Sequence, residues 1–274
     1  MEARNIVLIC LITFVWIWSL PLLIIGSLFM MPAALGVSVV CIFLGMFLQY
    51  SEHSMIQPEH WIRTYMSKIS WNQWFPCNIL HFDKGVIAVH PHGVLCCGAL
   101  AGIHFAPDSK TCMCIAPVVF YVPIIGLFAR KLGCIPADRH HMTLALNKGY
   151  PVLVVPGGVP EIVMAESGND QKRFERHGFL RIAQEMNAEV HAVYAQGECN
   201  TYKMFKGPFF ETRIWISWWL NIPLVFPILL GWYGSWMPKR VPLLLKTLKI
   251  ESYDKQIYKK KLETLYKNTK LMSI

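Results

Sequence analysis

Residues 85–93 read Gly-Val-Ile-Ala-Val-His-Pro-His-Gly, so a short apolar run ends in two histidines that one proline separates. The run is rich in β-branched residues and glycine bounds it, which is typical of a buried strand followed by a turn. Proline favours an extended backbone at His90, and an extended His92 would project its imidazole to the same side. Because imidazole titrates near neutral pH, histidines at a strand end predict a general base.

On either side of this stretch, short strand-like runs alternate with helix-like segments. The pattern predicts strands over 85–90, 111–116, 151–155 and 189–194, and helices over 93–104, 121–132, 138–148 and 176–187. Asp138 is the expected N-cap of its helix, and Gly149 closes that helix. Such alternation predicts an α/β domain with a largely parallel sheet, in which ligands bind beyond the carboxyl ends of the strands.

Charge is scarce and unevenly distributed along the chain. The 274 residues are 54% hydrophobic and 16% charged, with a net charge of +9 and a mean hydropathy of +0.37. Residues 5–51 carry no charge, a length sufficient for two bilayer crossings of about 20 residues each. We expect a membrane hairpin with helices near 6–25 and 33–49, which makes residues 1–51 an anchor and 52–274 the water-facing domain. The alternative is a cleaved signal peptide followed by one helix.

A second uncharged stretch covers residues 214–238 and holds five tryptophans. Pro223 and Pro227 would break a spanning helix, and tryptophan suits the depth of lipid headgroups. We therefore expect a monotopic patch or the wall of an apolar substrate tunnel, with a tryptophan-rich core as the alternative.

The C-terminal stretch 239–270 holds ten lysines and arginines against three acidic residues, and its apolar residues recur at near-helical spacing. A basic amphipathic helix beside a membrane anchor predicts attraction to anionic lipid on the cytosolic leaflet. A nucleic-acid partner is not expected, because such proteins do not place a long uncharged run beside the basic patch. A solvated tail without a partner is the alternative.

The cysteines predict a reducing compartment. Nine is an odd count, and their spacing is irregular, unlike the disulfide framework of a secreted protein. Cys112, Cys114 and His104 raise the alternative of a zinc site, but no second pair follows at the spacing of a zinc finger. We therefore expect structural cysteines and no metal or other cofactor.

Five blocks of the sequence resemble the diacylglycerol acyltransferase type 2 family, which includes monoacylglycerol acyltransferases and wax synthases. The His-Pro-His-Gly motif of that family matches in full at residues 90–93, and Trp74-Phe75-Pro76 is similar to its aromatic-Phe-Pro triplet. Further blocks follow in family order. They are Val155-Pro156-Gly157-Gly158 with Glu161, Arg176-His177-Gly178-Phe179-Leu180-Arg181, and Ala195-Gln196-Gly197-Glu198.

The resemblance implies an α/β acyltransferase domain with a mixed sheet, helices on both faces and an N-terminal transmembrane or re-entrant hairpin. It implies acyl-CoA as co-substrate and the hydroxyl of a mono- or diacylglycerol as acceptor, which would yield triacylglycerol. A fatty alcohol acceptor, giving a wax ester, is the alternative reaction. The expected location is the endoplasmic reticulum membrane with the catalytic part facing the cytosol, or a lipid droplet. Membrane lipid is an expected partner, and a homo-oligomer is compatible with the sequence.

The expected reaction is direct transfer with a histidine as general base. We assign that base to His92, with His90 as partner or alternative, and a carboxylate from Glu161 or Glu198 orients the imidazole. Backbone N–H groups at Gly93, Gly157 or Gly158 are candidates to stabilise the oxyanion. The remaining expected substrate contacts are Arg139 and Arg176 for the phosphates of CoA, together with Pro91, Gly178 and Phe179 from the family motifs.

Two other mechanisms remain open on the residues alone. Cys96 or Cys97 beside His92 could form an acylated thiol. A non-catalytic lipid-binding hairpin protein is the alternative outside enzymes, and it has no need of the histidine pair. The chain also departs from the family, because the usual Gly-x-Pro-Ile stretch is absent after Pro238.

Overall fold

This computed structural model describes residues 56, 58, 61–68, 74–121, 125–158, 161–162, 176–204, 209–220, 229–230 and 237–271. Within that part of the chain, no helix combines the length and apolar character needed to cross a bilayer. The hairpin expected at 6–25 and 33–49 lies outside the described residues.

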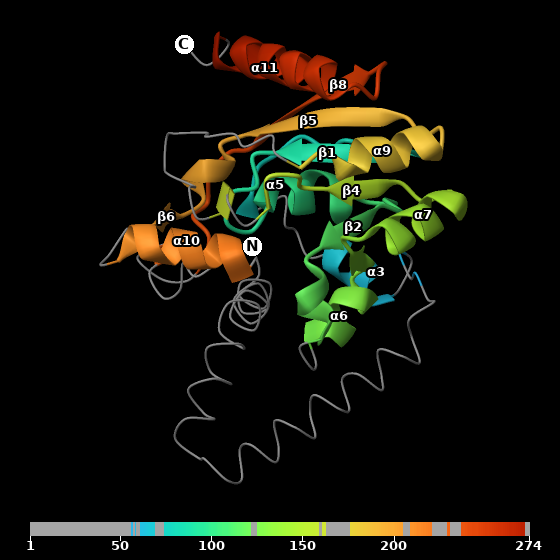
Figure 1. Ribbon diagram of the computed structural model, residues 1–274. Helices are drawn as coiled ribbons and strands as arrows, with labels where there is room; N and C mark the ends of the chain where they lie inside the picture. Colours follow the sequence, from blue (N-terminus) through green and yellow to red (C-terminus); the bar gives the residue numbers. More distant parts are fainter. Residues whose placement is uncertain are drawn as a thin grey trace.

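A six-stranded sheet forms the centre of the domain, in the order β3-β2-β4-β1-β5-β8 (Figure 1). Its strands are β1 (Val86–His90), β2 (Cys112–Ile115), β3 (Cys134–Pro136), β4 (Val152–Val154), β5 (Val190–Gln196) and β8 (Leu244–Ile250). The first five are parallel to their neighbours, and β8 is antiparallel to β5. β1 therefore lies inside the sheet, with its end at His90 paired with Tyr194 of β5.

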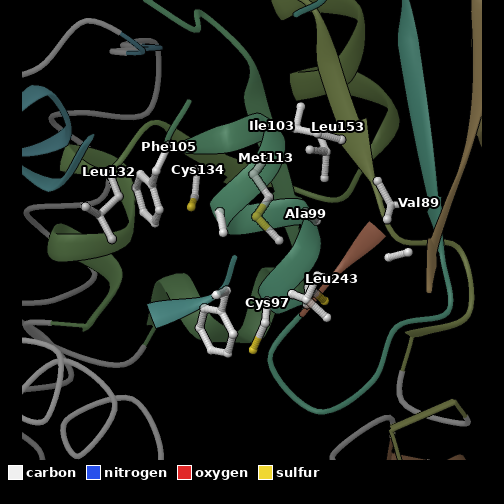
Figure 2. Close-up of a cluster of buried hydrophobic side chains, with 14 of the residues drawn as sticks. Val89, Cys97, Ala99, Ile103, Phe105, Met113, Leu132, Cys134, Leu153 and Leu243 are labelled. Atoms are coloured by element: carbon white, nitrogen blue, oxygen red, sulfur yellow. The ribbon is translucent and has the colours of Figure 1, made fainter. Parts of the chain in front are cut away.

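Alternate strand residues face two separate apolar clusters, because successive side chains of a strand point to opposite faces. On one face, Ile87 and Val89 pack with α5 (Cys97–Ala99), the π-helical turn η1 (Leu100–His104) and α6 (Ile125–Lys131), as Figure 2 shows in part. On the other face, Val86 and Ala88 pack with α7 (Arg139–Asn147), α9 (Gly178–Glu185) and α11 (Lys255–Leu271). The predicted mixed sheet with helices on both faces is confirmed.

The four predicted strands and the capped helix are confirmed. The carboxylate of Asp138 accepts a hydrogen bond from the backbone N–H of His141 at 2.9 Å, and Gly149 ends the helix with a φ of +77°. Such an N-cap stabilises a helix by about 1 kcal/mol. The helix predicted from residue 93 begins at Cys97 instead, because residues 93–95 form a turn after the histidines.

The basic C-terminal stretch is part of the folded domain, so the alternative of a solvated tail is wrong. Residues 244–250 form the edge strand β8, and Tyr258, Leu262 and Leu265 of α11 are buried in the core. Burying apolar side chains stabilises the fold by roughly 1.5–3 kcal/mol each. The apolar face of this helix is therefore occupied by the protein, and the exposed face keeps most of the lysines.

The Trp-Phe-Pro triplet ties the two ends of the domain together. Trp74 and Phe75 are buried, and the indole N–H of Trp74 donates to the carbonyl of Pro238 at 3.1 Å. The carbonyl of Pro76 accepts from the N–H of Leu243 at 2.9 Å. Pro76 thus fixes the entry of β8 into the sheet, and the two aromatic residues of the motif lie in the core.

The uncharged stretch 214–238 is described in part, as α10 (Phe210–Leu220) and the short strand β7 (Leu229–Leu230), which pairs with β6 (Lys203–Met204). Trp215 and Trp219 are 67% and 76% exposed. A buried tryptophan core is therefore wrong for these two residues. The remaining described elements are the helix α3 (Trp61–Lys68) and two 3₁₀ turns, η2 (Pro117–Tyr121) and η3 (Glu198–Asn200).

Candidate active site

The two histidines occupy a turn at the carboxyl end of β1. His90, the last residue of the strand, is fully buried, and a cis peptide joins it to Pro91, which is also buried. The Nε2 atom of His90 lies 3.0 Å from the hydroxyl of Tyr258 in α11, and its Nδ1 atom lies 3.9 Å from Oε1 of Glu161. His90 is therefore held between a phenol and a carboxylate, out of reach of solvent.

His92 is the partly exposed member of the pair. Its Nδ1 atom lies 3.0 Å from the carbonyl oxygen of Gly93, and because a carbonyl only accepts, this hydrogen bond requires the proton on Nδ1. Nε2 then carries the lone pair that a general base needs. Burial lowers the pKa of His92 below its usual 6.5, while the nearby Glu161 opposes that shift. The imidazole is therefore neutral at pH 7.

Glu161 joins the two histidines. Its carboxylate accepts a hydrogen bond from the backbone N–H of His92 at 2.8 Å and faces the ring of His90. The side chain is buried, so its charge is compensated by these contacts rather than by water. Gly157 makes this approach feasible, because a Cβ there would collide with the carboxylate of Glu161.

Glu198, the other carboxylate considered from the sequence, has a different task. It is fully buried and accepts hydrogen bonds from the backbone N–H groups of Cys97 and Gly98 at 2.8 and 2.7 Å. These two N–H groups open the helical segment after the histidine turn, so Glu198 caps that segment. A Cβ at Gly93 would lie 2.6 Å from Cγ of Glu198, and Gly93 has a φ of +56°. Glu198 thus packs against Gly93 and stabilises the turn that follows the histidines. Glu161 is the carboxylate that contacts the histidines themselves.

The thiol nearest to His92 is poorly suited to act as a nucleophile. Sγ of Cys96 lies 3.3 Å from Nδ1 of His92. Burial raises the pKa of Cys96 well above its usual 9.0, and the charges of Glu198 and Glu161 raise it further. Burial also raises the pKa of Cys97 well above 9.0. Both thiols are therefore protonated, whereas a nucleophilic cysteine needs a lowered pKa.

The structure places the other expected substrate residues at different distances from this turn. Arg176 is exposed and borders the glycine pair, because a Cβ at Gly158 would lie 3.1 Å from its guanidinium, and its charge reaches His92. Arg139 follows β3, which two strands separate from β1, and pairs with Glu185 at 2.7 Å. The structure brings Arg176, but not Arg139, to the histidine turn.

Three further residues of the family motifs, Gly158, Gly178 and Phe179, lie in different surroundings. The N–H of Gly158 donates to the carbonyl of Val155 at 3.3 Å within the turn, so it is not directed at a substrate. Gly178 is exposed at the start of α9. Phe179 is buried, and its ring meets the ring of Tyr258 edge-on, with centroids 5.4 Å apart.

Tyr258 is the residue at this site that the sequence did not indicate. It lies 168 positions after His90, in a stretch whose lysines dominate its composition. No local motif surrounds it, so only the packing of α11 against the sheet reveals the contact.

A groove of about 600 Å³ lies at the opposite edge of the sheet, where β1 and β5 begin. Lys84 and Lys249 line it, and Glu189 pairs with both, at 3.7 and 2.9 Å. Glu251 also lines the groove, so two lysines face two glutamates and there is no excess positive charge for the phosphates of CoA.

Taken together, the described residues form an α/β domain with a histidine and carboxylate site at the carboxyl edge of a parallel sheet. The sequence pattern of the family described as diacylglycerol acyltransferase matches residues 27–243. The chain therefore belongs to the diacylglycerol acyltransferase family.

Individual relatives are similar at a lower level. Diacylglycerol O-acyltransferase 2 of Xenopus laevis is 25% identical over 176 residues, which are 58% of this chain and 48% of that protein. The human 2-acylglycerol O-acyltransferase 3 is 25% identical over 194 residues, 63% of this chain and 54% of that protein. The chain thus spans about half the length of the curated relatives it matches.

Among solved structures, the 1-acyl-sn-glycerophosphate acyltransferase PlsC from Thermotoga maritima is similar to this chain. The TM-score is 0.44 and the sequence identity 14%, over 97% of this chain and 95% of that one.

Proposed function

We propose that this chain transfers a fatty acyl group from acyl-CoA to the hydroxyl of a mono- or diacylglycerol, with His92 as general base. The observation that carries the proposal is the neutral, partly exposed imidazole of His92 at the carboxyl end of β1, in a member of the diacylglycerol acyltransferase family. His90 is fully buried and faces Tyr258 and Glu161. It therefore acts as a partner rather than as the base.

The proposed reaction proceeds in two steps. Nε2 of His92 takes the proton of the acceptor hydroxyl while the hydroxyl oxygen attacks the carbonyl carbon of the thioester. The tetrahedral intermediate then collapses, the bond between carbon and sulfur breaks, and CoA thiolate leaves with the proton from the imidazolium. A positioned base of this kind contributes roughly 10²–10⁴-fold to the rate.

Residues beside the histidine turn fit the remaining needs of this reaction. The backbone N–H of Gly93 or Gly157 serves the oxyanion in the proposal, since that of Gly158 is engaged within its own turn. Arg176 serves the phosphates of CoA, because a guanidinium matches phosphate with paired hydrogen bonds and this side chain is exposed next to Gly158.

The enzyme of this proposal works at a membrane surface, on the cytosolic side of the endoplasmic reticulum or at a lipid droplet. The uncharged residues 5–51 and the exposed indoles of Trp215 and Trp219 support that location, because tryptophan concentrates at the headgroup region. α10 and α11 lie at different ends of the domain in Figure 1.

The test uses the purified full-length chain in phosphatidylcholine vesicles with labelled oleoyl-CoA. Monoacylglycerol, diacylglycerol, a long-chain alcohol and a lysophospholipid are supplied in turn as acceptors. The proposal predicts labelled diacylglycerol or triacylglycerol, and loss of this product in the His90→Ala/His92→Ala double variant.

His81→Ala is the matched control, since His81 is an exposed histidine that precedes β1. It should retain the activity of the unaltered chain. Transfer to the alcohol alone would replace the proposed acceptor class. Full acylglycerol transfer by the double variant would refute the role of the histidines.

A further inference from the structure

Tyr258 reaches the histidine turn from a helix that lies beyond the span shared with the family. The family pattern ends at residue 243, whereas Tyr258 belongs to α11 (Lys255–Leu271). α11 packs along β8 and β5, which brings its buried face over the end of β1. The C-terminal helix of this chain thus adds a side chain to a site whose other members come from the family motifs.

The surroundings of His90 favour one arrangement of the protons in this contact. The Nδ1 atom of His90 lies 3.9 Å from Oε1 of Glu161, an electrostatic contact longer than a hydrogen bond. The charge of the carboxylate favours the proton on this nitrogen. Nε2 is then the acceptor, and the hydroxyl of Tyr258 donates to it across 3.0 Å. Burial raises the pKa of Tyr258 far above its usual 10, and the charge of Glu161 adds to that shift. The phenol therefore keeps its proton at any pH at which the domain functions.

We propose that Tyr258 is a positioning residue that holds His90 in its Nδ1–H tautomer and thereby orients Glu161 against His92. The chain of contacts runs from the hydroxyl of Tyr258 to Nε2 of His90, from Nδ1 of His90 to Glu161, and from Glu161 to the backbone N–H of His92. Partners that fix the tautomer and the orientation of a functional imidazole typically change activity by about 10–100-fold when they are removed.

The hydroxyl and the ring of Tyr258 have different contacts, so a substitution can remove one and keep the other. The ring meets Phe179 of α9 edge-on at 5.4 Å and is buried in the core, so a phenylalanine can occupy the same space. Phe179 comes from a family motif and contacts the ring. It therefore explains the placement of the tyrosine without touching the reacting atoms.

The inference rests on the proposed function, and the test compares Tyr258→Phe with Tyr253→Phe in the full chain. Tyr253 is the matched control because its hydroxyl also ties the C-terminal segment to the domain, through the carbonyl of Ala188 at 3.1 Å. Transfer from labelled oleoyl-CoA to diacylglycerol is measured in phosphatidylcholine vesicles, together with the unfolding temperature.

Tyr258→Phe should lower kcat about tenfold with an unchanged KM for oleoyl-CoA, whereas Tyr253→Phe should retain kcat. A kcat of Tyr258→Phe equal to that of the unaltered chain overturns the inference while the proposed function stands. An equal loss in both variants overturns it as well, because the docking of the C-terminal segment, rather than one hydroxyl, would then control the rate.

A second measurement does not depend on activity. The full chain labelled with ¹⁵N-histidine gives nitrogen shifts that distinguish the two imidazole tautomers, and the His90 signals are assigned by their loss in His90→Gln. We expect the Nδ1–H form in the unaltered chain and in Tyr253→Phe, and a shift toward the Nε2–H form in Tyr258→Phe. Identical His90 shifts in Tyr258→Phe and the unaltered chain refute the positioning role, even if the chain transfers no acyl group.

Discussion

Burial lowers the pKa of both His104 and His92, so both imidazoles are neutral at pH 7. The two rings differ in the hydrogen bonds that their nitrogens make. His104 is fully buried, its Nε2 atom donates to the carbonyl of Leu132 at 2.9 Å, and its Nδ1 atom lies 3.4 Å from the hydroxyl of Thr111. His92 is partly exposed, and its Nδ1 atom donates to the carbonyl of Gly93 at 3.0 Å. Both nitrogens of His104 face oxygen atoms, whereas Nε2 of His92 lies 3.7 Å from the thiol of Cys96, a weak donor that a substrate hydroxyl can displace.

The surroundings of His104 explain why it has a structural role. The guanidinium of Arg63 in α3 is buried and donates to the carbonyl of His104 at 2.8 Å and to that of Pro58 at 2.8 Å. These contacts tie α3 to η1 through groups that would be costly to bury unpaired. A lowered pKa is thus common to both histidines. The functional one is distinguished by its partial exposure and by an Nε2 atom with only a weak thiol contact.

The largest expected effect is on catalysis. His92→Ala should lower acyl transfer by roughly 10²–10⁴-fold, since it removes the base, while the unfolding temperature stays close to that of the unaltered chain. Transfer rates in vesicles and thermal unfolding followed by circular dichroism check both parts. If the variant instead loses activity only because less of it is folded, His92 has a structural role like that of His104 and is not the base.

His104→Ala should have the opposite profile. The substitution leaves the carbonyl of Leu132 without the imidazole donor and opens a cavity, which costs about 2–4 kcal/mol of unfolding free energy. The hydroxyl of Thr111 keeps its contacts with Ser109 and Arg63. The folded fraction should keep its specific activity. Denaturant unfolding and activity per folded molecule test this, and a stable but inactive variant would contradict the assignment.

The pH dependence of stability sharpens the same contrast. Burial, and then the charge of Arg63, lower the pKa of His104 well below 6.5. Below pH 6.5 the unfolded chain therefore binds a proton that the folded chain does not. The free energy of unfolding falls as the pH drops from 6.5 toward the folded-state pKa, by about 1.4 kcal/mol per pH unit for this one proton. Unfolding curves from pH 7.5 to 5 should show a shallower slope in His104→Ala, and equal slopes would refute this origin.

The smallest effect is expected at the thiol beside the base. Cys96→Ala should keep most of the transfer rate, because the raised pKa of Cys96 keeps this thiol protonated. Mass spectrometry after incubation with labelled oleoyl-CoA should detect no acylated Cys96. An acylated thiol together with an inactive Cys96→Ala variant would make His92 the activator of a nucleophile instead.

The sequence pattern correctly predicted the strands and helix ends that depend only on neighbouring residues. The apolar run before His90 identified β1, and Asp138 and Gly149 identified the ends of α7, since a cap needs only its own helix. The family motif indicated Glu161, but the residues alone left Glu161 and Glu198 equivalent. Only the fold separates them, by placing Glu161 at the histidines and Glu198 beneath the helix start.

Elements that depend on distant partners were missed for a physical reason. β8 reads Leu-Leu-Lys-Thr-Leu-Lys-Ile, and its lysines made it part of a basic tail. Lysine is common on edge strands because it discourages pairing with another chain, and β8 lies at such an edge. Tyr258 was missed because its partner His90 lies 168 positions away. The expectations for the hairpin at 6–25 and 33–49 lie outside the described residues and stay predictions.

A single-turnover pH profile of acyl transfer by the unaltered chain tests the role of His92 most directly. Labelled oleoyl-CoA and diacylglycerol are mixed with excess protein between pH 5 and 8, and the rate of product formation is recorded. Because burial lowers the pKa of His92, the rate should be constant near pH 7 and fall in acid with a midpoint below 6.5. A rate that does not change across this range, or a midpoint above 6.5, would contradict a neutral His92 as the base.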